Sequence, residues 1–158
     1  MRYLLVDRIE SIDPDRSAVA WKNVAMSEDY LEWHFPGRPI VPGTIVLEAF
    51  AQLAGWLEAA SSGCERWVLL DRVTSARYSG FSVPGDRIEL FLERVAGTDP
   101  ARRSYRGESK VKGERRALVE FEAVVVPVET LDAKETVARD LATLRGPAAP
   151  GDRSRPRT

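Results

Sequence analysis

A run of apolar residues between Thr44 and Ala60 constrains this chain more than any other feature of its sequence. Pro42 and Gly43 precede the run and mark a helix start, because proline suits the first turn and lacks the N–H that would stay unpaired there. The run covers nearly the whole circumference of the predicted helix with apolar side chains: Ile45, Val46, Leu47, Ala49, Phe50, Ala51, Leu53, Ala54, Trp56 and Leu57. This pattern predicts a helix enclosed by other structure rather than an amphipathic one.

The exceptions to the apolar pattern form one narrow stripe along this helix. At 100° per residue, Thr44, Glu48, Gln52 and Gly55 fall close together on one side. Burying an unpaired carboxylate is costly, so Glu48 should be hydrogen-bonded, neutral or directed at a polar cavity. The only histidine, His34, lies shortly before the helix in a His-Phe-Pro-Gly turn. Taken singly, both residues also suit ordinary structural roles, and that alternative stays open here.

The remainder of the sequence is mainly typical of strands separated by turns. Alternation and turn signals predict strands at 2–10, 16–25, 67–78, 86–96, 102–111 and 116–128, with a single helical turn at 27–30. A sheet of such strands must cover an apolar helix. We therefore predict an α+β fold in which a curled antiparallel sheet wraps around one long central apolar helix.

The C-terminal part has a different composition. Residues 130–145 predict a helix with Leu131, Val137, Leu141 and Leu144 near one face, interpreted as a solvated surface helix without a functional role. From Gly146 onward the chain is rich in Pro, Gly and Arg, which is typical of a flexible tail. The predicted organisation is a domain at 1–128, a helical extension at 129–145 and a tail at 146–158.

Composition narrows the function classes. With 23 basic and 24 acidic residues, the net charge of −1 gives no reason to expect nucleic acid or an anionic membrane as partner. One cysteine, Cys64, cannot form an internal disulfide, and the early charges at Asp7 and Arg8 interrupt any signal-peptide core. The apolar helix is shorter than a comfortable membrane span. These observations predict a cytoplasmic protein without a membrane anchor.

Two motifs carry a resemblance to a known family. The segment HFPGRPIVPGTIVLEAFAQ at 34–52, followed by ARY at 76–78 and VPGD at 83–86, resembles the 3-hydroxyacyl-[acyl-carrier-protein] dehydratases of bacterial fatty-acid synthesis, the FabZ type. The similarity runs from about residue 3 to residue 128. It implies the hot-dog fold, independently of the argument from periodicity.

The resemblance also implies roles for four residues in dehydrating a (3R)-3-hydroxyacyl thioester to the trans-2-enoyl thioester. His34 is the base that takes the C2 proton, and Glu48 is the acid that protonates the departing 3-hydroxyl, directly or through water. The Gly43 amide at the helix start holds the thioester carbonyl, where unpaired N–H groups and the helix dipole suit a developing oxyanion. Gln52 orients Glu48 or supports the pocket.

The family further implies a partner and an assembly. The substrate arrives on acyl carrier protein, and the site forms at a homodimer interface, with a trimer of dimers as a further option. Trp33, Phe35, Tyr78 and Phe81 are expected along an apolar acyl tunnel, with a core aromatic role for Tyr78 as the alternative. No cofactor is implied, since the thioester is the electron sink, and one His and one Cys leave too few ligands for a zinc site.

Two positions depart from the family pattern and leave the substrate open. Trp33 stands where relatives have a small residue beside the histidine, and Phe81 stands near a usual proline. The pathway could therefore be fatty-acid or a dedicated polyketide-type synthesis. Two alternatives also remain: a hot-dog thioesterase, and a non-catalytic acyl-thioester binding subunit whose site Trp33 blocks. Glu48 favours dehydration without isomerisation, since the related FabA-type enzymes carry aspartate there.

Overall fold

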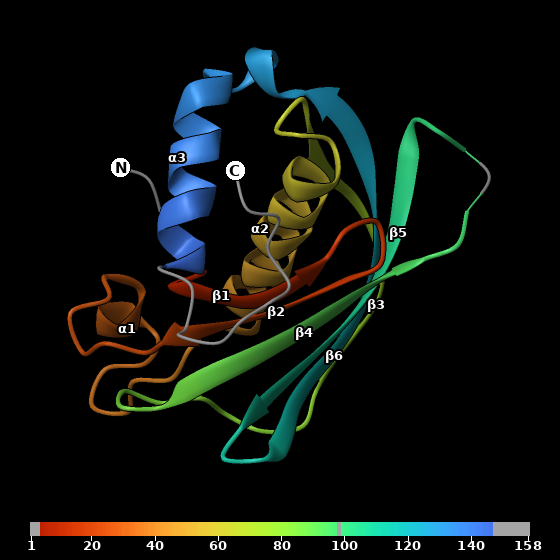
Figure 1. Cartoon of the computed structure of the whole chain (residues 1–158). Helices are drawn as coiled ribbons and strands as arrows, with labels where there is room; N and C mark the ends of the chain where they lie inside the picture. The colour runs from red at the N-terminus through yellow and green to blue at the C-terminus, as the bar shows by residue number, and fades with distance from the viewer. Residues whose placement is uncertain (1–3, 98, 147–158) are drawn as a thin grey trace.

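The computed structural model describes residues 4–97 and 99–146 (Figure 1). In chain order its elements are β1 (Arg8–Asp13), β2 (Ser17–Asn23), α1 (Tyr30–Trp33), α2 (Gly43–Ser61), β3 (Arg66–Tyr78), β4 (Arg87–Val95), β5 (Arg102–Val111), β6 (Glu114–Pro127), the 3-10 helix η1 (Val128–Thr130) and α3 (Lys134–Arg145). The long apolar segment is therefore helical, as predicted, and begins at Gly43.

The strands form a six-stranded antiparallel sheet in the order β1-β2-β4-β5-β6-β3. The predicted alternation is confirmed, because Ile88, Leu90 and Leu92 of β4 are buried, while Arg87, Glu89 and Phe91, which alternate with them, are exposed. β3 ends the strand order, so the outer edge of this 13-residue strand has no partner strand in the described chain.

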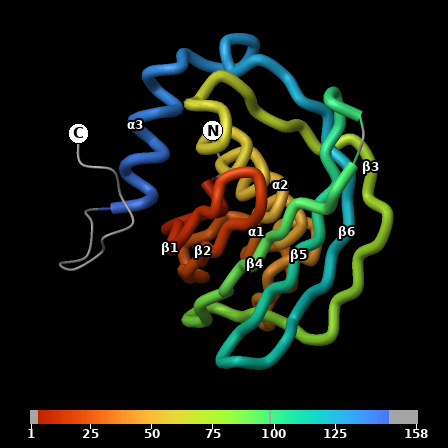
Figure 2. The backbone as a smooth tube through the Cα atoms, turned by 45° about the vertical axis from the view of Figure 1, so that its right-hand side comes forward, coloured from red at the N-terminus to blue at the C-terminus, as the bar shows by residue number. Residues whose placement is uncertain are grey.

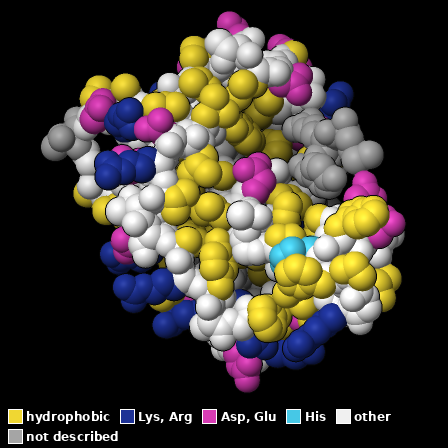
Figure 3. Space-filling view, turned by 180° about the vertical axis from the view of Figure 1, so that it is seen from behind, with side chains coloured by type: hydrophobic (Ala, Val, Ile, Leu, Met, Phe, Trp, Pro, Cys, Tyr) yellow, Lys and Arg dark blue, Asp and Glu magenta, His cyan; other side chains and the backbone are white. Residues whose placement is uncertain are grey.

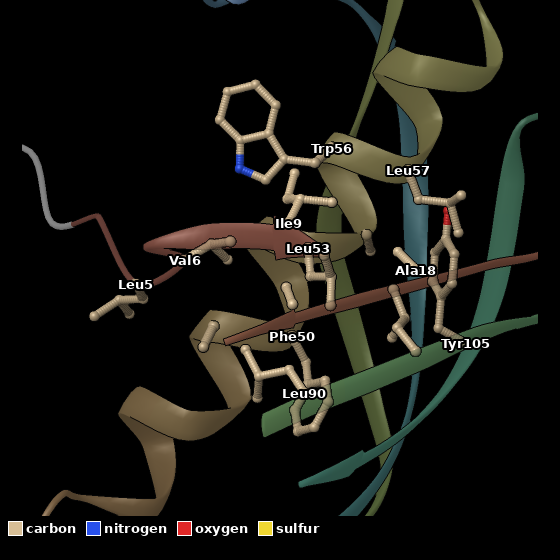
Figure 4. Close-up of a cluster of buried hydrophobic side chains, with 14 of the residues drawn as sticks. Leu5, Val6, Ile9, Ala18, Phe50, Leu53, Trp56, Leu57, Leu90 and Tyr105 are labelled. Atoms are coloured by element: carbon tan, nitrogen blue, oxygen red, sulfur yellow. The ribbon is translucent and has the colours of Figure 1, made fainter. Parts of the chain in front are cut away.

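The sheet curls around α2, which lies along its concave face (Figures 1 and 2). Phe50, Leu53 and Leu57 of the helix are at most 1% exposed. Figure 4 shows these side chains against residues of β1, β2, β4 and β5. Burying a side chain of this size contributes about 1.5–3 kcal/mol each to the free energy of unfolding. The predicted arrangement of a curled sheet around one central helix is confirmed.

Burial along α2 is uneven, which corrects the prediction of a helix enclosed all round. Every residue from Leu53 to Ala59 is buried, but Thr44 and Glu48 are exposed and Leu47 is only half-buried. The curled sheet covers the second half of the stripe, where Trp67 of β3 packs directly on Gly55. In the single chain, the described residues leave the first half of the stripe open.

The C-terminal helix is packed more closely than predicted. Val137 and Leu141 are buried in the core, and Leu144 packs against the same cluster, whereas Leu131 is 51% exposed. α3 lies beside α2, on the side away from β3, β5 and β6 (Figures 1 and 2). The interpretation as a solvated surface helix therefore holds only for the outer face of α3, because the open side of the curled sheet leaves apolar surface for its inner face to cover.

Boundaries differ most near the N-terminus. The first strand begins at Arg8 and extends to Asp13, later than predicted, because Leu5 and Val6 are buried in the core without joining the sheet ladder. α1 is the predicted single helical turn but begins at Tyr30. The tail predicted at 146–158 lies, apart from Gly146, outside the described residues.

Candidate active site

The turn between α1 and α2 carries His34 on a hydrogen-bonded frame. The backbone amides of Phe35 and Arg38 each donate to the carbonyl of the other, across 3.2 and 2.9 Å, and the Ile40 amide donates to the His34 carbonyl across 2.8 Å. Gly37 in the middle has a φ of 74°, a left-handed conformation that glycine adopts without strain. The His-Phe-Pro-Gly motif thus holds the histidine in a defined position.

A second backbone contact fixes the protonation pattern of the imidazole. Nδ1 of His34 lies 3.0 Å from the carbonyl oxygen of Ile40. A carbonyl can only accept, so Nδ1 carries the proton and Nε2 of the neutral ring keeps its lone pair. The Phe35 ring stacks on the imidazole, with centroids 4.2 Å apart. His34 is thereby oriented as a base with one available nitrogen.

The loop after β3 is tied to this turn. The Val41 amide donates to the Ser82 carbonyl across 2.8 Å. Asp86, which is 7% exposed, accepts from the Val83 amide across 2.9 Å and pairs with Lys112 across 3.2 Å. Burial alone would raise the pKa of this carboxyl group, but the Val83 amide and the Lys112 ammonium stabilise its ionised form and hold its pKa below the usual value.

The start of α2 presents backbone N–H groups. The Ile45 and Val46 amides are the first to donate within the helix, both to the Pro42 carbonyl, and no side chain of the described residues caps this terminus. The amides of Gly43 and Thr44 precede them, where helix geometry offers no intrahelical acceptor. A side chain at Gly43 would lie 2.9 Å from the Tyr78 ring, so glycine is needed for the ring to pack on the helix start.

Gln52 connects Glu48 to the N-terminal segment. Its side-chain amide donates to Oε1 of Glu48 across 3.1 Å, and its side-chain oxygen accepts from the Leu5 amide across 3.0 Å. Glu48 is therefore hydrogen-bonded, as predicted, but it is exposed, so the premise that its carboxylate is buried is wrong for the single chain. The reason is the uncovered first half of α2 described above.

A cavity of about 390 Å³ lies between the histidine turn, the start of α2 and the concave face of the sheet. It brings together four of the residues predicted for the site, which are His34, Gly43, Tyr78 and Phe81. Glu48 and Gln52 are not among the residues that line it. One chain thus places the candidate base and the candidate carbonyl-binding amide at a common cavity, and the candidate acid elsewhere.

The predicted tunnel aromatics divide into two groups. Tyr78 and Phe81 line the cavity, whereas Trp33 and Phe35 lie outside it, with Trp33 75% exposed. α1 is a single turn whose buried residue is Leu31, so Trp33 at its end stays at the surface. Figure 3 shows hydrophobic side chains gathered around the histidine on this face. Trp33 therefore does not block the cavity in the single chain.

Two polar residues of the cavity were not predicted. Ser109 of β5 and Arg116 of β6 both contribute to its wall. Ser109 pairs with Ala117, which in turn pairs with Tyr78, so the three lie side by side across the sheet. Alternation along 102–111 was a usable signal, since Tyr105, Gly107, Ser109 and Val111 share the buried face.

The described residues offer little for metal binding. Among them, no three His, Cys, Asp or Glu side chains lie close enough to hold a metal ion. No helix within 4–97 and 99–146 is long and apolar enough to cross a membrane.

Sequence comparisons agree with the two motifs. Residues 1–127 match the family model described as FabA-like domain. The 3-hydroxyacyl-[acyl-carrier-protein] dehydratase FabZ of Anaeromyxobacter sp. (strain Fw109-5) is 36% identical over 132 residues, covering 80% of this chain and 83% of that protein. The dehydratase of the same name from Myxococcus xanthus (strain DK1622) is 37% identical over 139 residues, covering 86% and 90%.

Solved structures share the fold at lower identity. The smu.793 protein of Streptococcus mutans UA159, determined bound to acetyl CoA, has a TM-score of 0.62 at 14% identity and covers 80% of this chain and 94% of that one. A hypothetical thioesterase of Streptococcus pneumoniae TIGR4, determined with coenzyme A, has a TM-score of 0.59 at 18% identity, covering 76% and 85%. At this level of identity, these similarities confirm the hot-dog fold alone.

Proposed function

The chain belongs to the family of FabA-like domains, and from this premise we propose that it dehydrates a (3R)-3-hydroxyacyl thioester on acyl carrier protein to the trans-2-enoyl thioester. It is then a hydro-lyase of fatty-acid or polyketide-type synthesis. The observation that carries the proposal is the hydrogen bond from His34 to the Ile40 carbonyl, which leaves Nε2 as the basic nitrogen of a residue that lines the cavity.

His34 takes the first step. The thioester carbonyl acidifies the C2 proton, and a neutral imidazole is basic enough to remove it near neutral pH. Nε2 accepts this proton because Nδ1 already carries one. The Ile40 carbonyl then faces the N–H of a charged ring, which strengthens their hydrogen bond as the charge develops.

The start of α2 stabilises the negative charge that develops on the substrate. As C2 loses its proton, charge moves to the thioester oxygen, and the Gly43 amide at the cavity wall can donate to it. The positive end of the helix dipole adds to this stabilisation. Tyr78 packs against the same glycine and limits the space in which the carbonyl lies.

Glu48 completes the site from a second chain. The free edge of β3 carries the exposed apolar residues Leu69, Leu70 and Val73, and unpaired strand edges of this kind favour pairing with another chain. A partner on this side would also cover the open half of α2. The proposed assembly is a homodimer in which Glu48 of one subunit delivers a proton to the 3-hydroxyl beside His34 of the other.

The same residues favour one product, and we place the reaction in one compartment. Glutamate at the acid position favours the 2-enoyl product without migration of the double bond. Acyl carrier protein delivers the chain in the cytoplasm, as the sequence predicts. No cofactor takes part, because each proton transfer is assigned to a side chain.

The test is the reversible hydration of a 2-enoyl thioester, on acyl carrier protein and on a pantetheine mimic, followed by enoyl absorbance. His34→Ala and Glu48→Gln should each lower the rate by about 10²–10⁴ relative to wild type while folding and dimerisation stay intact. Glu32→Gln is the matched control, since it makes the same change at an exposed glutamate that does not line the cavity. Unchanged rates in both variants would refute the assigned roles.

The two alternatives predict different outcomes in the same assay. A thioesterase would release free thiol from the substrate, which a thiol reagent detects without any change in enoyl absorbance. A non-catalytic subunit would bind the acyl thioester and leave it unchanged. That alternative depended on Trp33 closing the site, and Trp33 lies outside the cavity.

A further inference from the structure

Ser109 places a hydroxyl group on the concave face of the sheet. It is 0% exposed and lines the cavity that His34 shares. The strand register puts it in one row with Leu90 of β4, Ala117 of β6 and, beyond them, Tyr78 of β3. Within the part of the chain that the structure describes, its Oγ has no hydrogen-bond partner.

Arg116 approaches the same cavity from the neighbouring strand. Ser109 pairs with Ala117 while Lys110 pairs with Arg115, so Arg116 is the extra residue of a bulge. Its Nη2 pairs with Oε2 of Glu114 across 3.0 Å.

The Arg116 side chain also packs on the loop after β3. A side chain at Gly80 would lie 2.6 Å from Nη1 of Arg116, so glycine leaves room for the guanidinium there. Nε is buried and, among the described residues, has no acceptor.

Two unpaired polar atoms in one cavity wall require a physical reason. Buried hydroxyl and N–H groups are nearly always hydrogen-bonded, because leaving one unpaired is destabilising. Apolar residues such as Val41, Val46 and Ala117 supply much of the remaining wall and satisfy neither atom. A ligand that enters this cavity with an oxygen atom would bring the acceptor that this wall does not supply.

We propose that the cavity selects acyl chains that carry a neutral oxygen, as a ketone or a hydroxyl group, beyond C3. This oxygen accepts hydrogen bonds from Oγ of Ser109 and Nε of Arg116. A neutral group fits because the charge of Arg116 is already balanced by Glu114. The inference rests on the proposed function, in which the acyl chain occupies the cavity that His34 lines.

The test compares pairs of 2-enoyl pantetheine thioesters that differ only in a ketone replacing one CH₂, at C6 or C7. Wild type should hydrate one ketone chain with a kcat/KM about tenfold above its saturated counterpart, the usual effect of one or two added hydrogen bonds. Ser109→Ala should bring this ratio to about one. Arg116→Gln should also lower the ratio.

Ser104→Ala is the matched control, since Ser104 is on the same strand and outside the cavity. It should preserve the preference. If Ser109→Ala slowed both chains equally, the hydroxyl would serve the pantetheine arm or the fold, and the inference would be overturned. Equal rates for both chains in wild type would also overturn it, while leaving the proposed dehydratase activity intact.

A binding measurement tests this preference for a chain oxygen independently of the proposed dehydratase activity. If wild type hydrates neither chain, the proposed function fails, and calorimetry with unreactive saturated acyl thioesters, with and without the ketone, decides the inference alone. Tighter binding of the ketone chain that disappears in Ser109→Ala would support it. Equal binding would refute it.

Discussion

The side chain of Gln52 donates to Oε1 of Glu48, one helical turn earlier, across 3.1 Å. The same side chain accepts a hydrogen bond from the Leu5 amide across 3.0 Å, so both its oxygen and its nitrogen are held. A long glutamate side chain on an open helix face would otherwise sample several rotamers. Gln52 is therefore a positioning residue for the candidate acid.

Replacing Gln52 by glutamate should expose this role. The introduced carboxyl group keeps the size and can still accept from Leu5, but at neutral pH it repels the carboxylate of Glu48 instead of donating to it. We expect kcat to fall about tenfold or more at pH 8, with little change in KM. An effect on KM with kcat unchanged would contradict the positioning role.

A site shared between subunits predicts complementation. His34→Ala and Glu48→Gln chains are each inactive alone, but a mixed dimer of the two contains one site with both intact residues. Unfolding and refolding an equimolar mixture should therefore recover about one quarter of the wild-type rate, by random pairing of subunits. The measurement is enoyl hydration together with light scattering, which should report twice the mass of one chain. No recovery from well-formed dimers would place both residues of each site in one chain.

Asp86 should make the protein sensitive to acid. Its pKa in the folded chain lies below the usual value, so its contribution to stability is present above the unfolded pKa and is lost as pH falls through the folded one. Asp86→Asn removes this contribution and should lower the free energy of unfolding by about 1–2 kcal/mol at pH 7. The difference between variant and wild type should narrow as pH falls below about 4 in urea titrations. An equal difference at every pH would assign the effect to packing.

Ser109→Ala should stabilise the free protein. Removing a buried hydroxyl without a partner relieves its desolvation penalty, so we expect a gain of about 1 kcal/mol in the free energy of unfolding. Thermal unfolding measures this directly, with Ser104→Ala as the control that should change little. A loss of stability would show that the hydroxyl is satisfied in solution. The stabilising change and the loss of substrate preference would together identify a residue kept for function.

Much of this architecture follows from local patterns. The Pro-Gly pair at 42–43 marks the helix start, and alternation in β4 and β6 marks the buried face of the sheet, because both signals arise from a few adjacent residues. The cavity is different, since it depends on strand register. Ser109 joins the wall through pairing across two strands, and Arg116 joins it through a bulge, which neighbouring residues alone do not specify.

The stripe on α2 shows where periodicity misleads. The argument that a buried carboxylate needs partners is sound, but the carboxylate that it describes is Glu58, which is 1% exposed, and not Glu48. Both lie on the half of the helix that carries the stripe, about 80° apart at 100° per residue. The curled sheet covers this side only beyond Gly55, and the extent of that cover is a tertiary property. Periodicity in the sequence predicts the stripe, but it does not predict which half of the stripe is buried.

Glu58 then predicts a stability effect that Glu48 does not share. Its carboxylate accepts from Nε of Arg66 across 2.8 Å and from Nε of Arg103 across 3.4 Å. Glu58→Gln leaves these arginines without their buried counter-charge and should lower the free energy of unfolding by about 2–3 kcal/mol, somewhat less than for a fully buried pair because Arg66 is partly exposed. Glu65→Gln is the matched control, because Glu65 forms an exposed ion pair with Lys134. Urea unfolding should give this variant a free energy of unfolding within about 0.5 kcal/mol of wild type. Equal small effects at both positions would mean that water reaches Glu58 in solution, which the packing of β3 and β5 around it argues against.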